Sequence, residues 1–202
     1  MVVAMSKKLE YNSKDLKKIK KDLKKKLSED RYIHTLGVAN TAVSLAMCYG
    51  EDIAKAQYAG ILHDSAKYLS NEEYIRECKK YKIKYDKVLK NSPSLLHGYL
   101  GATYSIELYD IDDEDIYNSI YNHTFGSDSM SLLEEIIYVA DYIEPNRDYF
   151  DGLDDIRKLA FKDIKAAIAV ISNRKIEYTK SKGQEVFEAS YKTLDFYKQY
   201  SK

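Results

Sequence analysis

Apolar residues recur at steps of three and four along most of the chain, which is the spacing of one face of an α-helix. The pattern is clear near the N-terminus, where the segment 13–27 carries lysines on its other positions and Ser13 is placed to cap a helix. The apolar stripe consists of Leu16, Ile19, Leu23 and Leu27. We therefore predict a surface helix with a basic outer face.

Helix start and stop signals divide the rest of the chain into further helical segments. Ser28 and Gly50 bound one of them, Ser70 and Ser131 each begin a capping-box pattern, and Pro93 suits a first helical turn. The predicted helices cover about 28–50, 51–63, 70–80, 92–100, 112–122, 131–143, 154–182 with a break near Lys162, and 190–200, and residues 82–91 are ambiguous. Because only two prolines and eight glycines occur, we predict an all-α helical bundle.

The composition limits the class of protein. The 202 residues suffice for one sizeable core, and we expect one domain over residues 28–202 after a lysine-rich extension, residues 1–27. Lys plus Arg and Asp plus Glu both number 32, so no overall field favours nucleic acid or a membrane surface as a partner. Cys48 and Cys78 lack metal-ligand spacing, and we find no signal peptide or membrane span, so we expect a cytoplasmic protein with reduced thiols.

All four histidines lie in mostly apolar, helix-like segments and none lies on the many exposed polar faces. They are His34, His63, His97 and His123. A single buried histidine is usually a hydrogen-bonded core residue. Four histidines confined to such segments indicate a shared site.

Two carboxylates accompany these histidines. Asp64 directly follows His63, and Asp141 lies in the apolar run 138–142, where an unpaired carboxylate would be strongly unfavourable. Asp141 therefore needs a cation, either an arginine or a metal ion. Two imidazoles and two carboxylates suit divalent iron, manganese or zinc. We predict that the metal ligands are His34, His63, Asp64 and Asp141.

Basic side chains near these ligands could bind an anionic substrate. Lys67 lies one helical turn beyond Asp64, and Arg147 follows a helix stop at Glu144. Either could instead be an ordinary ion-pair partner. His97 and His123 also have two interpretations, as ligands of a second metal bridged by Asp64 or as hydrogen-bond donors to phosphates, and we favour the donors. Hydrolysis of a phosphate ester or anhydride is the natural use of such a site.

Five short motifs follow one another in a specific order along the chain. They are the segments 31–39, 62–67, 95–98, 123–126 and 140–147. Together they resemble the YqeK family of HD-domain proteins. The resemblance implies an all-α HD fold, the metal ligands named above, and contacts from His97, His123 and Arg147 to nucleotide phosphates. It also implies iron as the metal, with manganese or another divalent ion as the alternative, and symmetrical cleavage of diadenosine tetraphosphate into two ADP.

Our leading hypothesis is a metal-dependent hydrolase of a small nucleotide, with no nucleic-acid partner and a sequence compatible with a homodimer. We assign catalysis to Asp64, Lys67, His97 and His123, and substrate contacts to Lys67, His97, His123 and Arg147. One alternative is an HD phosphohydrolase acting on an alarmone, a cyclic nucleotide or a deoxynucleotide. Another is a di-iron oxygenase, which needs His97 and His123 as ligands. A third is a nucleotide- or RNA-binding module that uses the lysine-rich helix.

Overall fold

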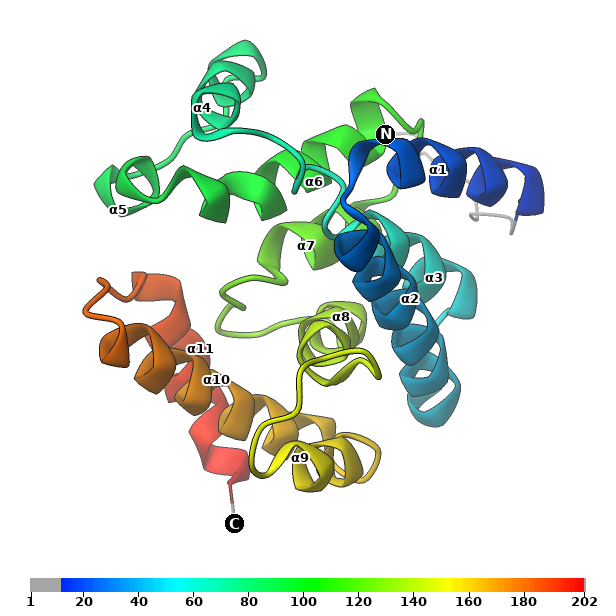
Figure 1. Cartoon of the computed structure of the whole chain (residues 1–202). Coiled ribbons are helices and arrows are strands. Elements are labelled where there is room, and N and C mark those ends of the chain that lie inside the picture. The colour runs from blue at the N-terminus through cyan, green and yellow to red at the C-terminus, as the bar shows by residue number, and fades with distance from the viewer. Residues whose placement is uncertain (1–11, 202) are drawn as a thin grey trace, which may run out of the picture.

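The computed structural model describes residues 12–201, and within that range it contains helices and loops but no β-strand (Figure 1). The predicted all-α bundle is confirmed. The helices are α1 (Ser13–Lys26), α2 (Glu29–Tyr49), α3 (Ile53–Leu62), α4 (Asn71–Lys80), α5 (Lys87–Asn91), the 3-10 helix η1 (Pro93–Leu96), α6 (His97–Glu107), α7 (Glu114–Asn122), α8 (Leu132–Ile143), α9 (Leu153–Ala160), α10 (Ile164–Ser181), α11 (Glu188–Tyr197) and the 3-10 helix η2 (Lys198–Tyr200).

The capping signals fix most helix ends where the sequence predicts them. Ser28 accepts a hydrogen bond from the Arg31 amide, and Gly50 closes α2 with a positive φ of 78°. Ser70 and Ser131 each form a complete capping box. The residue that caps α1 is Asn12, one position before the predicted Ser13.

Two segments differ in detail from the prediction. The helix expected from residue 92 begins as the 3-10 turn η1 and becomes α-helical only at His97. The ambiguous segment 82–91 contains the short helix α5, which Asp86 caps through the Leu89 amide. The predicted break near Lys162 is confirmed, because α9 ends at Ala160 and Asp163 caps α10.

The helix α1 belongs to the main hydrophobic core. Its four stripe residues are buried and pack in the same cluster as apolar residues of α2, α3 and α8. Most of its lysines are exposed, so the helix lies at the surface with its apolar face inward, as the pattern predicts. Residues 1–11 of the predicted extension lie outside the described part of the chain.

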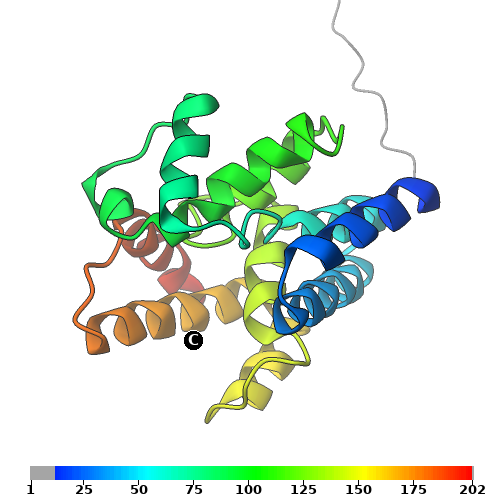
Figure 2. The ribbon, with the colours of Figure 1, turned by 45° about the horizontal axis from the view of Figure 1, so that its top comes forward.

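The helix α8 lies in the middle of the bundle. Figures 1 and 2 show α2 and α3 on one side of it and α10 and α11 on the other, and α8 contacts α2, α3, α7 and α10. The pair α2 and α3 packs closely, since a Cβ at Gly60 would come 2.7 Å from the Ala39 Cα. None of the helices in residues 12–201 is long and apolar enough to cross a bilayer.

Candidate metal centre

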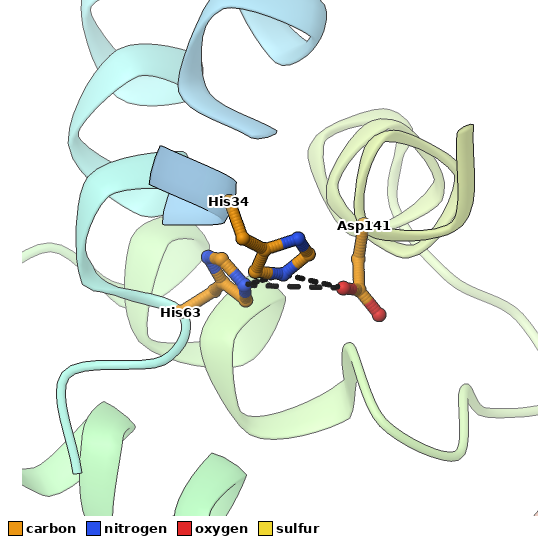
Figure 3. Close-up of side chains that lie close together, drawn as sticks. All are labelled: His34, His63 and Asp141. Carbon is orange, nitrogen blue, oxygen red and sulfur yellow. Dashed lines mark hydrogen bonds and ion pairs between the residues drawn. The ribbon is translucent and has the colours of Figure 1, made fainter. Parts of the chain in front are cut away.

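Three of the predicted metal ligands approach one another from different helices (Figure 3). His34 lies in the second turn of α2, His63 directly follows α3, and Asp141 lies in the last turn of α8. The His34 Nε2 is 3.2 Å from Asp141 Oδ1 and 3.4 Å from His63 Nε2. The three ligand atoms lie within 4.8 Å of one another. One divalent ion could contact all three, since metal bonds to nitrogen and oxygen are about 2.0–2.2 Å long.

Asp64 lies between two pairs of histidines. Its Oδ2 is 3.6 Å from His63 Nε2 and 3.8 Å from His34 Nε2. Its Oδ1 is 3.3 Å from His97 Nε2 and 3.8 Å from His123 Nε2. The ligand atoms of His63, Asp64 and His123 form a second group within 4.8 Å. The structure thus brings all four histidines and both carboxylates into one cluster.

Each histidine ring directs Nδ1 at an oxygen acceptor on the periphery of this cluster. The acceptors are Gly60 O for His63 at 2.7 Å, Ser94 O for His97 at 2.7 Å, Ile120 O for His123 at 2.6 Å and Glu144 Oε1 for His34 at 3.2 Å. In a neutral imidazole the Nδ1 that faces an acceptor carries the proton, so Nε2 keeps its lone pair. The lone pairs of His63 and His123 then point into the cluster, in the tautomer that ligates metals. His34 Nε2 also faces the Asp141 carboxylate, and His97 Nδ1 also faces the Lys67 ammonium.

The contacts between ring nitrogens also favour a cation at this position. The Nε2 atoms of His97 and His123 are 3.0 Å apart, and two lone pairs at that distance repel each other unless a cation or a proton lies between them. The Lys67 ammonium is 3.3 Å from His97 Nε2 and relieves part of this repulsion.

Burial and charge give the cluster a donor set that fits a divalent ion. Burial lowers the pKa of His63, His97 and His123, that of His123 to about 4. Burial opposes charge on the carboxylates as well, but the surrounding histidines and basic groups hold the pKa of Asp64 and of Asp141 well below the ordinary value. The cluster therefore offers neutral imidazoles together with ionised carboxylates, which is what a divalent ion requires.

His34 differs electrostatically from the other three histidines. Burial opposes its charge, yet the hydrogen bond to Asp141 and the nearby Asp64 and Glu144 carboxylates raise the pKa of His34 above the ordinary value. In the protein without metal, His34 is thus the histidine that most readily holds a second proton. A metal ion at Nε2 would have to replace that proton.

The two predicted basic residues lie at the edge of the cluster. Lys67 Nζ is 2.9 Å from His97 Nδ1, and burial lowers the pKa of Lys67 despite the Asp64 carboxylate. Arg147 donates to the backbone oxygen of Asp141 and, at 3.3 Å, to its Oδ1. A surface cleft of about 590 Å³ opens beside His34, and Arg31 and Arg147 both line it. Both arginines could contact an anion in this cleft, although Asp30, Glu144 and Asp148 line it as well.

Three further residues at the centre were not predicted from the sequence. Arg31 donates to Asp64 Oδ2 at 2.9 Å, and Glu144 accepts from His34. Lys175, on α10, donates to the Thr124 carbonyl at 3.2 Å, and its ammonium lies 4.1 Å from the Tyr138 ring centroid. Burial lowers the pKa of Lys175 to about 8, although the Asp141 carboxylate opposes the shift.

Helical spacing could have revealed two of these three residues. Arg31 precedes His34 by three positions and Glu144 follows Asp141 by three, so each shares a helix face with a predicted ligand. Lys175 carries no such signal, because its approach to the centre depends on how α10 packs against α8.

The comparison with known families identifies the class of protein. A model of the HD domain matches residues 31–146. The chain belongs to the HD-domain family.

Individual relatives narrow this class. The chain is 41% identical over 174 residues to the symmetrical bis(5'-nucleosyl)-tetraphosphatase of Bacillus subtilis (strain 168), which covers 86% of this chain and 92% of that protein. It is 41% identical over 165 residues to the protein of the same name from Halalkalibacterium halodurans, covering 82% and 87%. The crystal structure of a predicted HD superfamily hydrolase involved in NAD metabolism from Clostridium acetobutylicum has a TM-score of 0.88 at 39% identity, covering 92% and 97%. The predicted resemblance to the YqeK family is confirmed.

Proposed function

We propose that this protein is a metal-dependent hydrolase that cleaves diadenosine tetraphosphate symmetrically into two ADP. The observation that carries the proposal is the joint position of two ionised carboxylates and four imidazole Nε2 atoms, beside a cleft lined by Arg31 and Arg147. Two relatives that are 41% identical to this chain are named for that activity, and the chain aligns with most of the length of each. A polyphosphate chain matches a cleft whose basic groups converge on a metal centre.

We propose His34, His63, Asp64 and Asp141 as the metal ligands. Their support is the short separation of their ligand atoms and the direction of His63 Nδ1, which faces the Gly60 carbonyl and leaves Nε2 free for a metal. When bound, a divalent ion here would lower the pKa of a water molecule and polarise a phosphoryl oxygen. We propose iron as this ion, on the resemblance to the YqeK family, and manganese is compatible with the same nitrogen and oxygen donors.

The basic residues would bind the phosphate chain of the substrate. Lys67 lies beside His97, Arg147 donates to Asp141, and Arg31 adds a third cation beside Asp64. Their charges would stabilise the negative charge that shifts onto the leaving ADP as an inner phosphorus–oxygen bond breaks. We therefore propose Lys67 and Arg147 as substrate contacts, as the sequence predicts.

Two roles are open to His97 and His123, and the metal content of a variant separates them. As donors to phosphate, both rings would have to present a proton at Nε2. As ligands of a second ion that Asp64 bridges, they would present lone pairs, which the Nδ1 contacts to Ser94 and Ile120 favour. Replacing His123 by alanine leaves the metal content unchanged in the first case and halves it in the second, which elemental analysis of the purified variant measures.

Chromatography of the reaction products tests the proposed activity. Protein loaded with iron should convert diadenosine tetraphosphate into ADP alone, and an Asp64→Asn variant should not. Formation of ATP plus AMP, or no turnover, would refute the proposal. Release of phosphate from an alarmone, a cyclic nucleotide or a deoxynucleotide at a higher rate would instead support another HD phosphohydrolase. Oxygen consumption with two ions per chain would support the oxygenase.

We propose that the protein acts in the cytoplasm on a free nucleotide. Its equal numbers of acidic and basic residues give no general attraction to nucleic acid. Cys48 and Cys78 are free in the structure, as expected for a reducing compartment.

A further inference from the structure

Glu144 is a buried carboxylate that lies behind the metal centre and does not enter it. It caps the C-terminal end of α8, and only 1% of its surface is exposed. One carboxylate oxygen, Oε1, is 3.2 Å from His34 Nδ1. The other, Oε2, accepts hydrogen bonds from the Asn146 amide at 2.7 Å and from Asn146 Nδ2 at 3.1 Å. Both oxygens thus have fixed partners, and one partner is a predicted metal ligand.

The backbone around this carboxylate is fixed as well. The Glu144 carbonyl accepts from Arg157 at 3.0 Å and from the Arg147 amide at 3.1 Å. Arg157 also donates to the Ile143 carbonyl at 3.0 Å. These bonds satisfy carbonyls at the end of α8 that have no partner within the helix. The position of the Glu144 side chain is therefore set by the rigid end of α8.

The recess that holds this carboxylate exists because residue 37 is glycine. Gly37 lies on α2, three positions after His34. A Cβ at this position would be 2.2 Å from Glu144 Oε2 and 2.9 Å from Asn146 Nδ2, closer than any van der Waals contact. Every other amino acid would therefore displace the carboxylate from this position, although α2 itself would tolerate alanine well.

We propose that Glu144 is a positioning residue of the metal centre, and that Gly37 provides the space in which it acts. Glu144 would hold the His34 proton on Nδ1, so that the Nε2 lone pair faces Asp141 and His63. A carboxylate behind a metal-bound imidazole fixes the tautomer and makes the ring a stronger ligand. This inference rests on the metal centre of the proposed function and adds two residues to it.

The hydrogen-bond pattern predicts that glutamine cannot replace Glu144. If the amide nitrogen of a glutamine took the place of Oε2, its N–H groups would face the two N–H donors of Asn146, and no hydrogen bond could form there. A glutamine turned the other way would donate to His34 Nδ1 and move the ring proton to Nε2, where it blocks metal binding. Only a group with two acceptor oxygens satisfies both sides, so the isosteric substitution is a sharp test.

The test measures Mn²⁺ affinity of metal-free protein by the electron paramagnetic resonance signal of unbound Mn²⁺. We expect Glu144→Gln and Gly37→Ala each to weaken binding by about 10- to 100-fold, the usual effect of removing such a partner. Glu135→Gln is the matched control, because Glu135 is buried on the same helix and bonds to Tyr197 instead. Asn40→Ala is the control on α2, since Asn40 lies exposed on the same helix.

A double substitution tests whether the two residues act through one carboxylate. In a Glu144→Ala background, Gly37→Ala should cause little further loss of affinity, whereas independent effects would multiply. Circular dichroism and urea unfolding establish that each variant is folded, and if Glu144→Gln fails to fold, Gly37→Ala carries the test. Wild-type affinity in Glu144→Gln or in Gly37→Ala would overturn the inference. Wild-type protein that binds Mn²⁺ but leaves diadenosine tetraphosphate intact would instead refute only the proposed function.

Discussion

Each end of α8 carries a carboxylate, buried at Glu135 and partly buried at Asp141, and the surroundings of the two carboxylates are opposite in character. Near the N-terminal end, Glu135 accepts a hydrogen bond from the Tyr197 hydroxyl at 2.9 Å, and the nearest ammonium, that of Lys165, is 3.8 Å away. Burial raises the pKa of Glu135. At the other end, Asp141 lies among His34, Arg147 and Lys175, and its pKa is well below the ordinary value. The neighbours of a carboxylate on this helix, and not its burial alone, therefore decide the direction of its pKa shift.

The sequence alone does not distinguish the surroundings of Glu135 from those of Asp141. Glu135 and Asp141 both have apolar neighbours in one helix, and the sequence does not show which of the two lies among cationic groups. Only the tertiary structure separates them, because Tyr197 comes from α11 and His34 from α2. A neutral donor satisfies one carboxylate, while histidines and basic groups surround the other.

The largest difference between the two ends should appear in catalysis. Replacing Asp141 by asparagine removes a predicted ligand, so kcat/KM for diadenosine tetraphosphate should fall by more than about 100-fold, beyond the usual loss for a partner of a ligand. Glu135→Gln should change kcat/KM by less than about twofold. Steady-state kinetics of both metal-loaded variants measure this contrast. If kcat/KM of Asp141→Asn stayed within tenfold of the wild-type value, the two ends of α8 would not differ in catalysis as predicted.

Alkali should destabilise the protein, and at the Glu135 end it should act through Tyr197. Burial and the neighbouring carboxylate raise the pKa of Tyr197, and burial also raises the pKa of Tyr74, Tyr104 and Tyr138. The folded state keeps these protons above pH 10 while the unfolded state loses them, so stability falls as pH rises. Each such tyrosine contributes a slope of about 1.4 kcal/mol per pH unit.

Urea unfolding between pH 10.5 and 11.5, followed by circular dichroism, measures this slope. Tyr197→Phe removes one ionisable phenol and should reduce the slope by the contribution of one tyrosine. Absorbance at 295 nm in the folded protein should show no tyrosinate from these buried groups. An unchanged slope in Tyr197→Phe would mean that the phenol ionises equally in both states.

Much of the fold and of the proposed ligand set could be predicted from local sequence signals. Capping residues predict helix ends because the caps act within a few positions, as Ser28, Ser70 and Ser131 show. His63 and Asp64 stand out because they are adjacent at a helix end. The directions of the Nδ1 atoms could not be predicted, since they depend on which backbone carbonyls the turns and helix ends present to each ring. Lys175 could not be predicted either, because α10 reaches the centre only through its packing on α8.

Lys175 lies near the Asp141 end of α8 and should contribute to substrate binding there. Its ammonium lies near Asp141, yet no carboxylate comes within 4 Å of it among residues 12–201. A phosphate of the substrate would supply the missing anion. Lys175→Met should therefore raise KM by about tenfold, worth about 1.4 kcal/mol, with little change in kcat.

Lys182→Met is the matched control for this substitution, because Lys182 lies exposed at the end of the same helix. The KM of Lys182→Met should equal that of the wild type. If Lys175→Met leaves KM unchanged, or lowers kcat alone, Lys175 supports the fold of α10 and does not contact the substrate.

The smallest expected effect is on stability and comes from Glu135 itself. Its pKa in the folded protein is raised above the ordinary value of 4.5, so the folded state binds more protons than the unfolded state just above pH 4.5. Stability therefore falls as pH rises through this window, and the ionised carboxylate remains unfavourable at pH 7.

Glu135→Gln removes that cost while keeping an acceptor for the Tyr197 hydroxyl. It should raise the free energy of unfolding at pH 7 by up to about 1 kcal/mol, and the gain should shrink toward pH 4.5. Urea unfolding at the two pH values measures the difference, and a loss of stability at pH 7 would show that the Lys165 ion pair outweighs burial of the charge.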